Sequence, residues 1–153
     1  MSNIEHDAGL KLRMRDEERR ISSQHRQLEE LFDRVMETVR AGGTRKAISE
    51  FLLFSTALEA HMSVEEDIYF PALHGLRNDA GDELGELIDE HQRLRERLAD
   101  LRLNLASNDE EEGLAGLEQL AAEVDRHEEA EEKLIARITE GPVSGLGKTS
   151  LDA

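Results

Sequence analysis

Apolar residues recur along most of the chain at alternating intervals of three and four residues, which is the spacing of side chains on one face of an α-helix. The recurrence is broken by short polar or Gly-containing segments at 41–43, 74–82 and 107–113. Four stripes remain, and together they predict an all-α protein. In chain order they are Ile21, His25, Leu28, Phe32, Val35 and Val39; Phe51, Phe54, Leu58, His61, Glu65, Ile68 and Ala72; Leu84, Leu87, His91, Leu94, Leu98, Leu101 and Leu105; Leu117, Leu120, Val124, His127, Glu131, Leu134 and Ile138.

The short breaks predict an up-down-up-down four-helix bundle, because a short loop makes each helix run back beside the preceding one. We expect the bundle to comprise residues 16–140, with a flexible N-terminal arm at 1–15 and a flexible C-terminal tail at 141–153. The last helix should end before Gly141. A chain of 153 residues fits one domain, and its richness in Glu, Leu, Arg and Ala favours helices.

Polar side chains occupy six positions of the apolar stripes. Each predicted hairpin brings its two histidines to nearly the same height, since a helix rises about 1.5 Å per residue. The first pair lies 18 residues either side of Gly43, and the last pair lies 18 residues either side of Asp109. One layer across the bundle should therefore contain His25, His61, Glu65, His91, His127 and Glu131.

The two halves of the chain repeat each other at an offset of 66 residues. The offset relates His25, His61, Glu65 and Glu66 to His91, His127, Glu131 and Glu132, and it relates Leu28 to Leu94 and Ile68 to Leu134. This repeat predicts two similar helical hairpins related by a pseudo-twofold axis.

Two buried carboxylates need positive charge nearby, because burying an uncompensated ion costs several kcal/mol and neutral imidazoles do not cancel its charge. We predict two metal ions, one bound by His25 and His61 and the other by His91 and His127. Glu65 and Glu131 would bridge the ions. Nitrogen and carboxylate donors without sulfur suit iron or manganese and do not exclude zinc. The alternative is a buried hydrogen-bonded network without metal.

Residues next to this layer leave alternatives open. Glu66 and Glu132 lie one position off their stripes, and they are hydrogen-bond partners of the ligands, alternate ligands or surface acids. Tyr69 is a core phenol, an additional ligand or a redox partner. His74 is thirteen residues from His61, too far along the helix for this layer, and His6 lies in the predicted arm.

Charge and composition exclude several classes of function. The formal charge of −16 disfavours nucleic acids and anionic membrane surfaces as partners. The lack of cysteine excludes disulfides, zinc–thiolate sites, iron–sulfur clusters and thiol nucleophiles. No stretch predicts a signal peptide or a membrane span, so we expect a cytoplasmic protein.

Four segments together resemble the ligand-bearing helices of the hemerythrin-like, or HHE cation-binding, domain. They are QHRQLEELF, HMSVEEDIYFPAL, EHQRLRERL and HEEAEEKL, and the resemblance covers roughly residues 20–140. It implies two iron ions in a non-haem centre bridged by two carboxylates and an oxo or hydroxo group. The ligand positions of the family fall on His25, His61, Glu65, His91, His127 and Glu131.

Two departures distinguish the chain from oxygen-carrying hemerythrins. Those proteins have a second histidine one turn after the third-helix ligand, where this chain has Arg95, and they place the last carboxylate at the position of Glu132. The remaining set of four His and two Glu is similar to the iron domain of the repair-of-iron-centres proteins, which also have a cysteine-bearing N-terminal domain. Fewer protein ligands imply exchangeable positions for water, dioxygen, nitric oxide, peroxide or an added donor.

The resemblance therefore implies a di-iron protein that binds, senses or reduces a small oxidant, or handles iron. A peroxide-decomposing oxidoreductase is the enzymatic version of this hypothesis. The alternative is a partner-gated iron sensor or a structural metal-binding module without catalysis. A homodimer is one candidate assembly. An encapsulin shell is another, because some hemerythrin-like proteins dock there through a short C-terminal peptide, and the tail here contains Val143, Leu146 and Leu151.

Overall fold

The computed structural model describes residues 2–107 and 109–152, with side chains described for 9, 12, 13, 15–107 and 109–140. Within these ranges the chain is helical and contains no strand. The elements are α1 (Ser2–Arg40), α2 (Thr44–Val64), the π-helical segment η1 (Glu65–Tyr69), α3 (Phe70–Leu76), the 3-10 segment η2 (Asn78–Ala80), α4 (Gly81–Ala106) and α5 (Glu110–Asp152).

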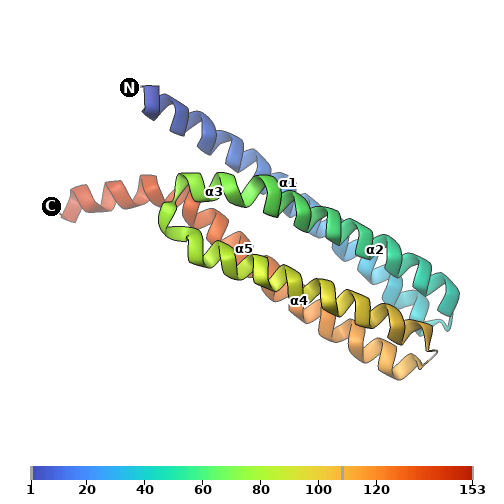
Figure 1. Ribbon diagram of the computed structural model, residues 1–153. Helices are drawn as coiled ribbons and strands as arrows, with labels where there is room; N and C mark the ends of the chain where they lie inside the picture. The colour runs from blue at the N-terminus through green and yellow to red at the C-terminus, as the bar shows by residue number, and fades with distance from the viewer. Residues whose placement is uncertain (1, 108, 153) are drawn as a thin grey trace.

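Elements α2, η1 and α3 follow one another as a single rod, so the described chain forms four long helical rods (Figure 1). Each rod runs back beside the previous one, and α1 also packs against α5 and α2 against α4. The predicted all-α, up-down-up-down bundle is confirmed. The first connection is very short because Gly42 adopts φ 82°, a left-handed conformation that suits glycine.

The apolar core is divided into two parts by the layer of polar ligand candidates. On α1, Ile21 belongs to one part and Leu28 to the other, with His25 between them. On α4, Leu87 and Leu94 flank His91 in the same way. The layer is therefore sealed above and below by packed apolar side chains, which keeps bulk water away from it.

The π-helical segment η1 changes which residues of the second rod face the core. The backbone N–H of Phe70 donates to the carbonyl of Glu65, five residues earlier, so the turn contains one extra residue. As a result Ile68, predicted to be in the core, is 67% exposed, whereas Tyr69 is 2% exposed. Pro71 contributes to this departure, because proline cannot donate a helical hydrogen bond and its ring crowds the carbonyl four residues earlier.

The extra residue also corrects the predicted repeat. From Tyr69 onward, at the end of η1, the offset between the two halves is 65 residues, so Tyr69 corresponds to Leu134 and Ile68 has no counterpart in the core. The following core positions keep the new offset: Phe70 with Ile135 and Leu73 with Ile138, all buried.

Helices α1 and α5 extend beyond the predicted bundle limits of 16 and 140, and α5 does not end before Gly141 as expected. Both ends project from the same end of the bundle, and the last part of α5 bends away from it (Figure 1). The side chains of Val143, Leu146 and Leu151 lie outside the described set, so shell docking stays a prediction. Among the described residues, no helix is long and apolar enough to cross a membrane.

Candidate metal centre

The six predicted ligand candidates meet at the centre of the bundle, and each is at most 7% exposed. They come from α1, α2, η1, α4 and α5, so every rod contributes. Among the described residues their ligand atoms form two clusters, each with all atoms within 4.8 Å of one another. One cluster is His25, His61, Glu65 and Glu131, and the other is Glu65, His91, His127 and Glu131. The two carboxylates belong to both clusters, as the bridging arrangement requires.

Every histidine directs its Nε2 atom toward a shared carboxylate. In the first cluster, His25 Nε2 lies 3.4 Å from Glu131 and His61 Nε2 lies 3.4 Å from Glu65. In the second cluster, His91 Nε2 lies 3.2 Å from Glu65, and His127 Nε2 lies 3.3 Å from Glu131. Each carboxylate therefore faces one imidazole of each hairpin.

The opposite ring nitrogen, Nδ1, donates to an outer acceptor in all four rings. The distances are 2.6 Å from His61 to Gln24, 2.6 Å from His91 to Glu66, 2.6 Å from His127 to Glu90, and 3.1 Å from His25 to Glu132. A proton fixed on Nδ1 leaves the Nε2 lone pair free to point at the centre. Such outer hydrogen bonds fix the tautomer and orientation of imidazoles that bind metals.

The inner atoms lack partners within the described chain. Both oxygens of Glu65, both oxygens of Glu131 and the Nε2 atoms of His91 and His127 are buried without a hydrogen bond. The Nε2 atoms of His25 and His61 are 3.1 Å apart, within hydrogen-bond distance of each other. Burial lowers the pKa of His25, but Glu131 and Glu128 outweigh burial and raise that pKa, so His25 can donate to the neutral His61. Hydrogen bonds within the described chain leave the other six atoms unsatisfied, whereas cations between the donors would satisfy them.

The electrostatics of the layer also favour a cation. Burial raises the pKa of Glu65 strongly, and the neighbouring Glu131 raises it further. Burial opposes ionisation of Glu131 as well, but its close polar neighbours Glu65, His127 and His25 outweigh burial and lower its pKa. The two carboxylates thus hold one proton between them at neutral pH. Burial lowers the pKa of His61 to about 4, so this ring is neutral and its nitrogen is available to a metal.

A comparison with known protein families shows to which family the chain belongs. The model of the hemerythrin HHE cation binding domain matches residues 16–138, which include the whole layer. The chain belongs to the hemerythrin HHE cation-binding family. Comparisons with curated proteins and with solved structures found no match. Cation binding is therefore the shared property of this hemerythrin-like domain.

The structure shows where the residues whose roles the sequence left undecided lie around the hemerythrin-like centre. Glu66 and Glu132 contact ring Nδ1 atoms, so they are outer partners of His91 and His25. Arg95 turns away from the layer and pairs with Glu59 at 2.8 Å and with Glu66 at 2.9 Å.

The remaining candidates lie beside the centre or outside it. Tyr69 is a buried phenol in the core cluster next to the layer, and burial raises its pKa. His74 contacts the backbone carbonyl of Asn78 at 3.2 Å and does not reach the layer. The side chain of His6 lies outside the described set.

Three outer residues were not predicted from the sequence. Gln24 and Glu90 accept hydrogen bonds from His61 and His127, and Glu128 lies 3.3 Å from Nδ1 of His25. A signal for two of them is present: Gln24 and Glu90 each directly precede a ligand histidine and are related by the same 66-residue offset. Glu128 has no such signal, because its counterpart in the first hairpin is a methionine. Burial raises the pKa of Glu128 to about 7.

Proposed function

We propose that this protein holds two iron ions between the four histidines and the two shared glutamates, and that the iron pair binds and reduces a small oxidant. The observation that supports it is the double cluster of buried, unpartnered donor atoms with two carboxylates in common. Iron fits the donor chemistry, because imidazole nitrogen with carboxylate oxygen is a frequent ligand set of redox-active non-haem iron.

The number of donors explains why such a pair would be reactive. Each ion would receive two imidazole nitrogens and two carboxylate oxygens from the chain. Iron in such sites commonly accepts six donors, so positions would be left for exogenous ligands. When bound, an iron pair would supply two neighbouring redox-active centres.

The residues of the chain would hold the ions, orient the imidazoles and limit access to the centre. Glu65 and Glu131 hold the two ions together and offset their charge. The outer acceptors keep each imidazole oriented, which prevents the nitrogen donors from rotating away when the charge on the centre changes. The packed core on both sides of the layer excludes large reductants and substrates, so the oxidant must be a small molecule such as dioxygen, nitric oxide or peroxide.

An absorption experiment on aerobically loaded protein tests this proposal. We expect near-ultraviolet charge-transfer bands from the ferric pair, which disappear on anaerobic reduction and return when dioxygen, nitric oxide or peroxide is added. The rate of return should exceed that of the same concentration of free iron. His91→Ala is a suitable control, since it removes one nitrogen donor whose ring is completely buried.

A structural metal site would behave differently. Bands that persist through reduction, or oxidant consumption no faster than with free iron, would contradict a redox function. The chain would then be a metal-binding module without catalysis.

A further inference from the structure

Two of the surface pockets outside the metal layer, one on each hairpin, are related by the sequence repeat. The first, of about 220 Å³, lies between α1 and α2 and ends on His61. The second, of about 520 Å³, lies between α4 and α5 and ends on His127. Adding 66 to seven of the eight lining positions of the first pocket gives lining positions of the second. They are the same site on the two halves of a pseudo-symmetric bundle.

The chemistry of the two pockets differs sharply. The lining of the first pocket includes Leu31, Ala57 and Ala60, and it contains no charged side chain. The corresponding positions of the second pocket are Arg97, Glu123 and Arg126. Equivalent backbone positions therefore make an uncharged, largely apolar pocket on one hairpin and a highly charged one on the other.

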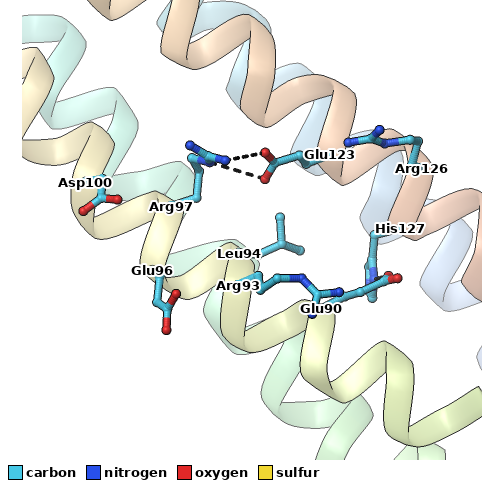
Figure 2. A pocket seen from close by; sticks show the side chains of 9 residues that line it. All are labelled: Glu90, Arg93, Leu94, Glu96, Arg97, Asp100, Glu123, Arg126 and His127. Carbon is cyan, nitrogen blue, oxygen red and sulfur yellow. Dashed lines mark hydrogen bonds and ion pairs between the residues drawn. The ribbon is translucent and has the colours of Figure 1, made fainter. Parts of the chain in front are cut away.

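An ion pair spans the charged pocket. Arg97 on α4 donates to Glu123 on α5 at 2.7 Å, and Figure 2 shows this pair crossing between the two helices beside Leu94. Arg93 and Glu90 lie on the other side of Leu94, close to His127 (Figure 2). Charged groups of this kind hold ordered water, which an apolar molecule must displace.

The same difference continues to the histidines at the inner ends of the pockets. His61 donates to the neutral amide of Gln24, whereas His127 donates to the carboxylate of Glu90, both at 2.6 Å. The first pocket is thus uncharged from its opening to the outer edge of the His61 ring, and that ring belongs to the first ligand cluster. Apolar cavities hold water weakly and take up apolar gases.

We propose that the pocket between α1 and α2 is the entrance for a neutral diatomic gas, dioxygen or nitric oxide, toward the His25–His61 half of the centre. The role of this pocket as an entrance rests on the proposed function, but the existence of the pocket does not depend on iron. The charged twin favours water over such gases, so we expect unequal access to the two metal positions.

Filling the pocket tests this entrance kinetically. Ala60→Phe in the iron-loaded, reduced protein should slow nitric oxide association several-fold and slow its dissociation to a similar extent, because a path affects both directions. The dissociation constant and the iron content should stay unchanged. Dioxygen association should slow in the same way. The matched control is Arg126→Phe in the charged twin, which should leave all these rates unchanged.

Two outcomes would overturn the proposal: unchanged rates in Ala60→Phe, or equal slowing in Ala60→Phe and Arg126→Phe. Ala57→Leu, one turn earlier on the same helix, provides a second blocking variant if Ala60→Phe does not load iron. A lowered affinity without slower association would also contradict it, since that result indicates a change at the metal.

A second measurement does not require iron. In the metal-free full chain under dioxygen pressure, paramagnetic broadening of methyl signals reports where the gas resides. Leu28 and Leu94 occupy equivalent positions in the two pockets and are 4% and 3% exposed, but Leu28 also lines another pocket with Phe32 and Val124. Ala57 lines the first pocket and not that one, so we expect stronger broadening at both Leu28 and Ala57 than at Leu94. Equal broadening at Ala57 and Leu94 would refute the entrance, whereas loss of iron binding alone would refute only the proposed function.

Discussion

At the scale of single residues, the centre contains strong metal donors that destabilise the fold when no metal is bound. Glu65 and Glu131 are almost completely buried, and none of their oxygens has a hydrogen-bond partner in the described chain. Unpartnered buried carboxylates destabilise a fold unless a cation compensates them. Residues of this kind are selected for binding rather than for stability.

Replacing one bridging carboxyl by a neutral amide should therefore stabilise the metal-free protein. For Glu65→Gln we expect the free energy of unfolding without metal to rise by about 1–3 kcal/mol at neutral pH, because Glu65 with its raised pKa must take up a proton on folding and an amide need not. Metal affinity should fall at the same time. Chemical denaturation of metal-free protein measures the first effect, with Glu66→Gln as the control that brings no gain. A decrease in stability for Glu65→Gln would contradict this account of the layer.

Each hairpin should lose one metal ion when one of its ligand histidines is replaced. His61→Ala takes a nitrogen from one cluster and His127→Ala takes one from the other, so each variant should retain about one metal ion per chain. Metal analysis after gel filtration checks this result. Two ions per chain in both variants would show that these imidazoles are not ligands.

At the scale of elements, the π-helical segment η1 is a one-residue insertion relative to the second hairpin. It explains why the core follows an offset of 66 residues up to Glu66 and of 65 residues from Tyr69 onward. A single exposed residue in η1 can be removed without rotating the core positions on either side of it. The same deletion in a regular helix rotates everything beyond it by about 100°.

Deleting Asp67 should therefore be tolerated, whereas deleting Lys133 should not. Asp67 is exposed and lies within η1, and its deletion restores a regular helix with Tyr69 and Leu73 still facing inward. Lys133 is equally exposed but lies in regular helix, so its deletion turns Leu134 out of the core. We expect similar melting temperatures for the Asp67 deletion and the parent chain, and a loss of several kcal/mol for the Lys133 deletion. Circular dichroism can follow the unfolding of both deletion variants. Equal destabilisation of the two would refute the interpretation of η1 as a one-residue insertion.

The sequence predicted the bundle and the ligand layer because both follow from periodic spacing and short loops. The heights of His25 and His61 depend only on residue counts from a tight turn, and the structure brings their Nε2 atoms to 3.1 Å. Periodicity could not predict the exposure of Ile68, since a π turn breaks the period locally. It also could not show which acids reach the rings, because such side-chain contacts between rods depend on helix rotation and rotamers.

At the scale of the whole molecule, the centre joins two core clusters that do not otherwise form a continuous apolar interior. Metal ions that bind the native state and not the unfolded chain add stability that grows with the logarithm of the free metal concentration relative to the dissociation constant. Their removal also leaves the buried oxygens of Glu65 and Glu131 without a partner in the described chain.

Metal removal should lower the melting temperature of the intact chain. At a free metal concentration of 100 times the dissociation constant, one site adds about 2.7 kcal/mol of stability. We expect a clear upward shift of the melting curve when iron is restored to metal-free protein at neutral pH. The His61→Ala variant should show a smaller shift than the parent chain. Identical melting curves with and without iron would count against a buried metal layer.

The most direct test of the central claim is an anaerobic titration of metal-free protein with ferrous iron, followed by metal analysis. Two shared carboxylates and four imidazoles predict saturation at two ions per chain. Glu131→Ala removes a donor common to both clusters, so it should weaken both binding events. Saturation at one ion or none, or two tightly bound ions in Glu131→Ala, would contradict a paired centre at this layer.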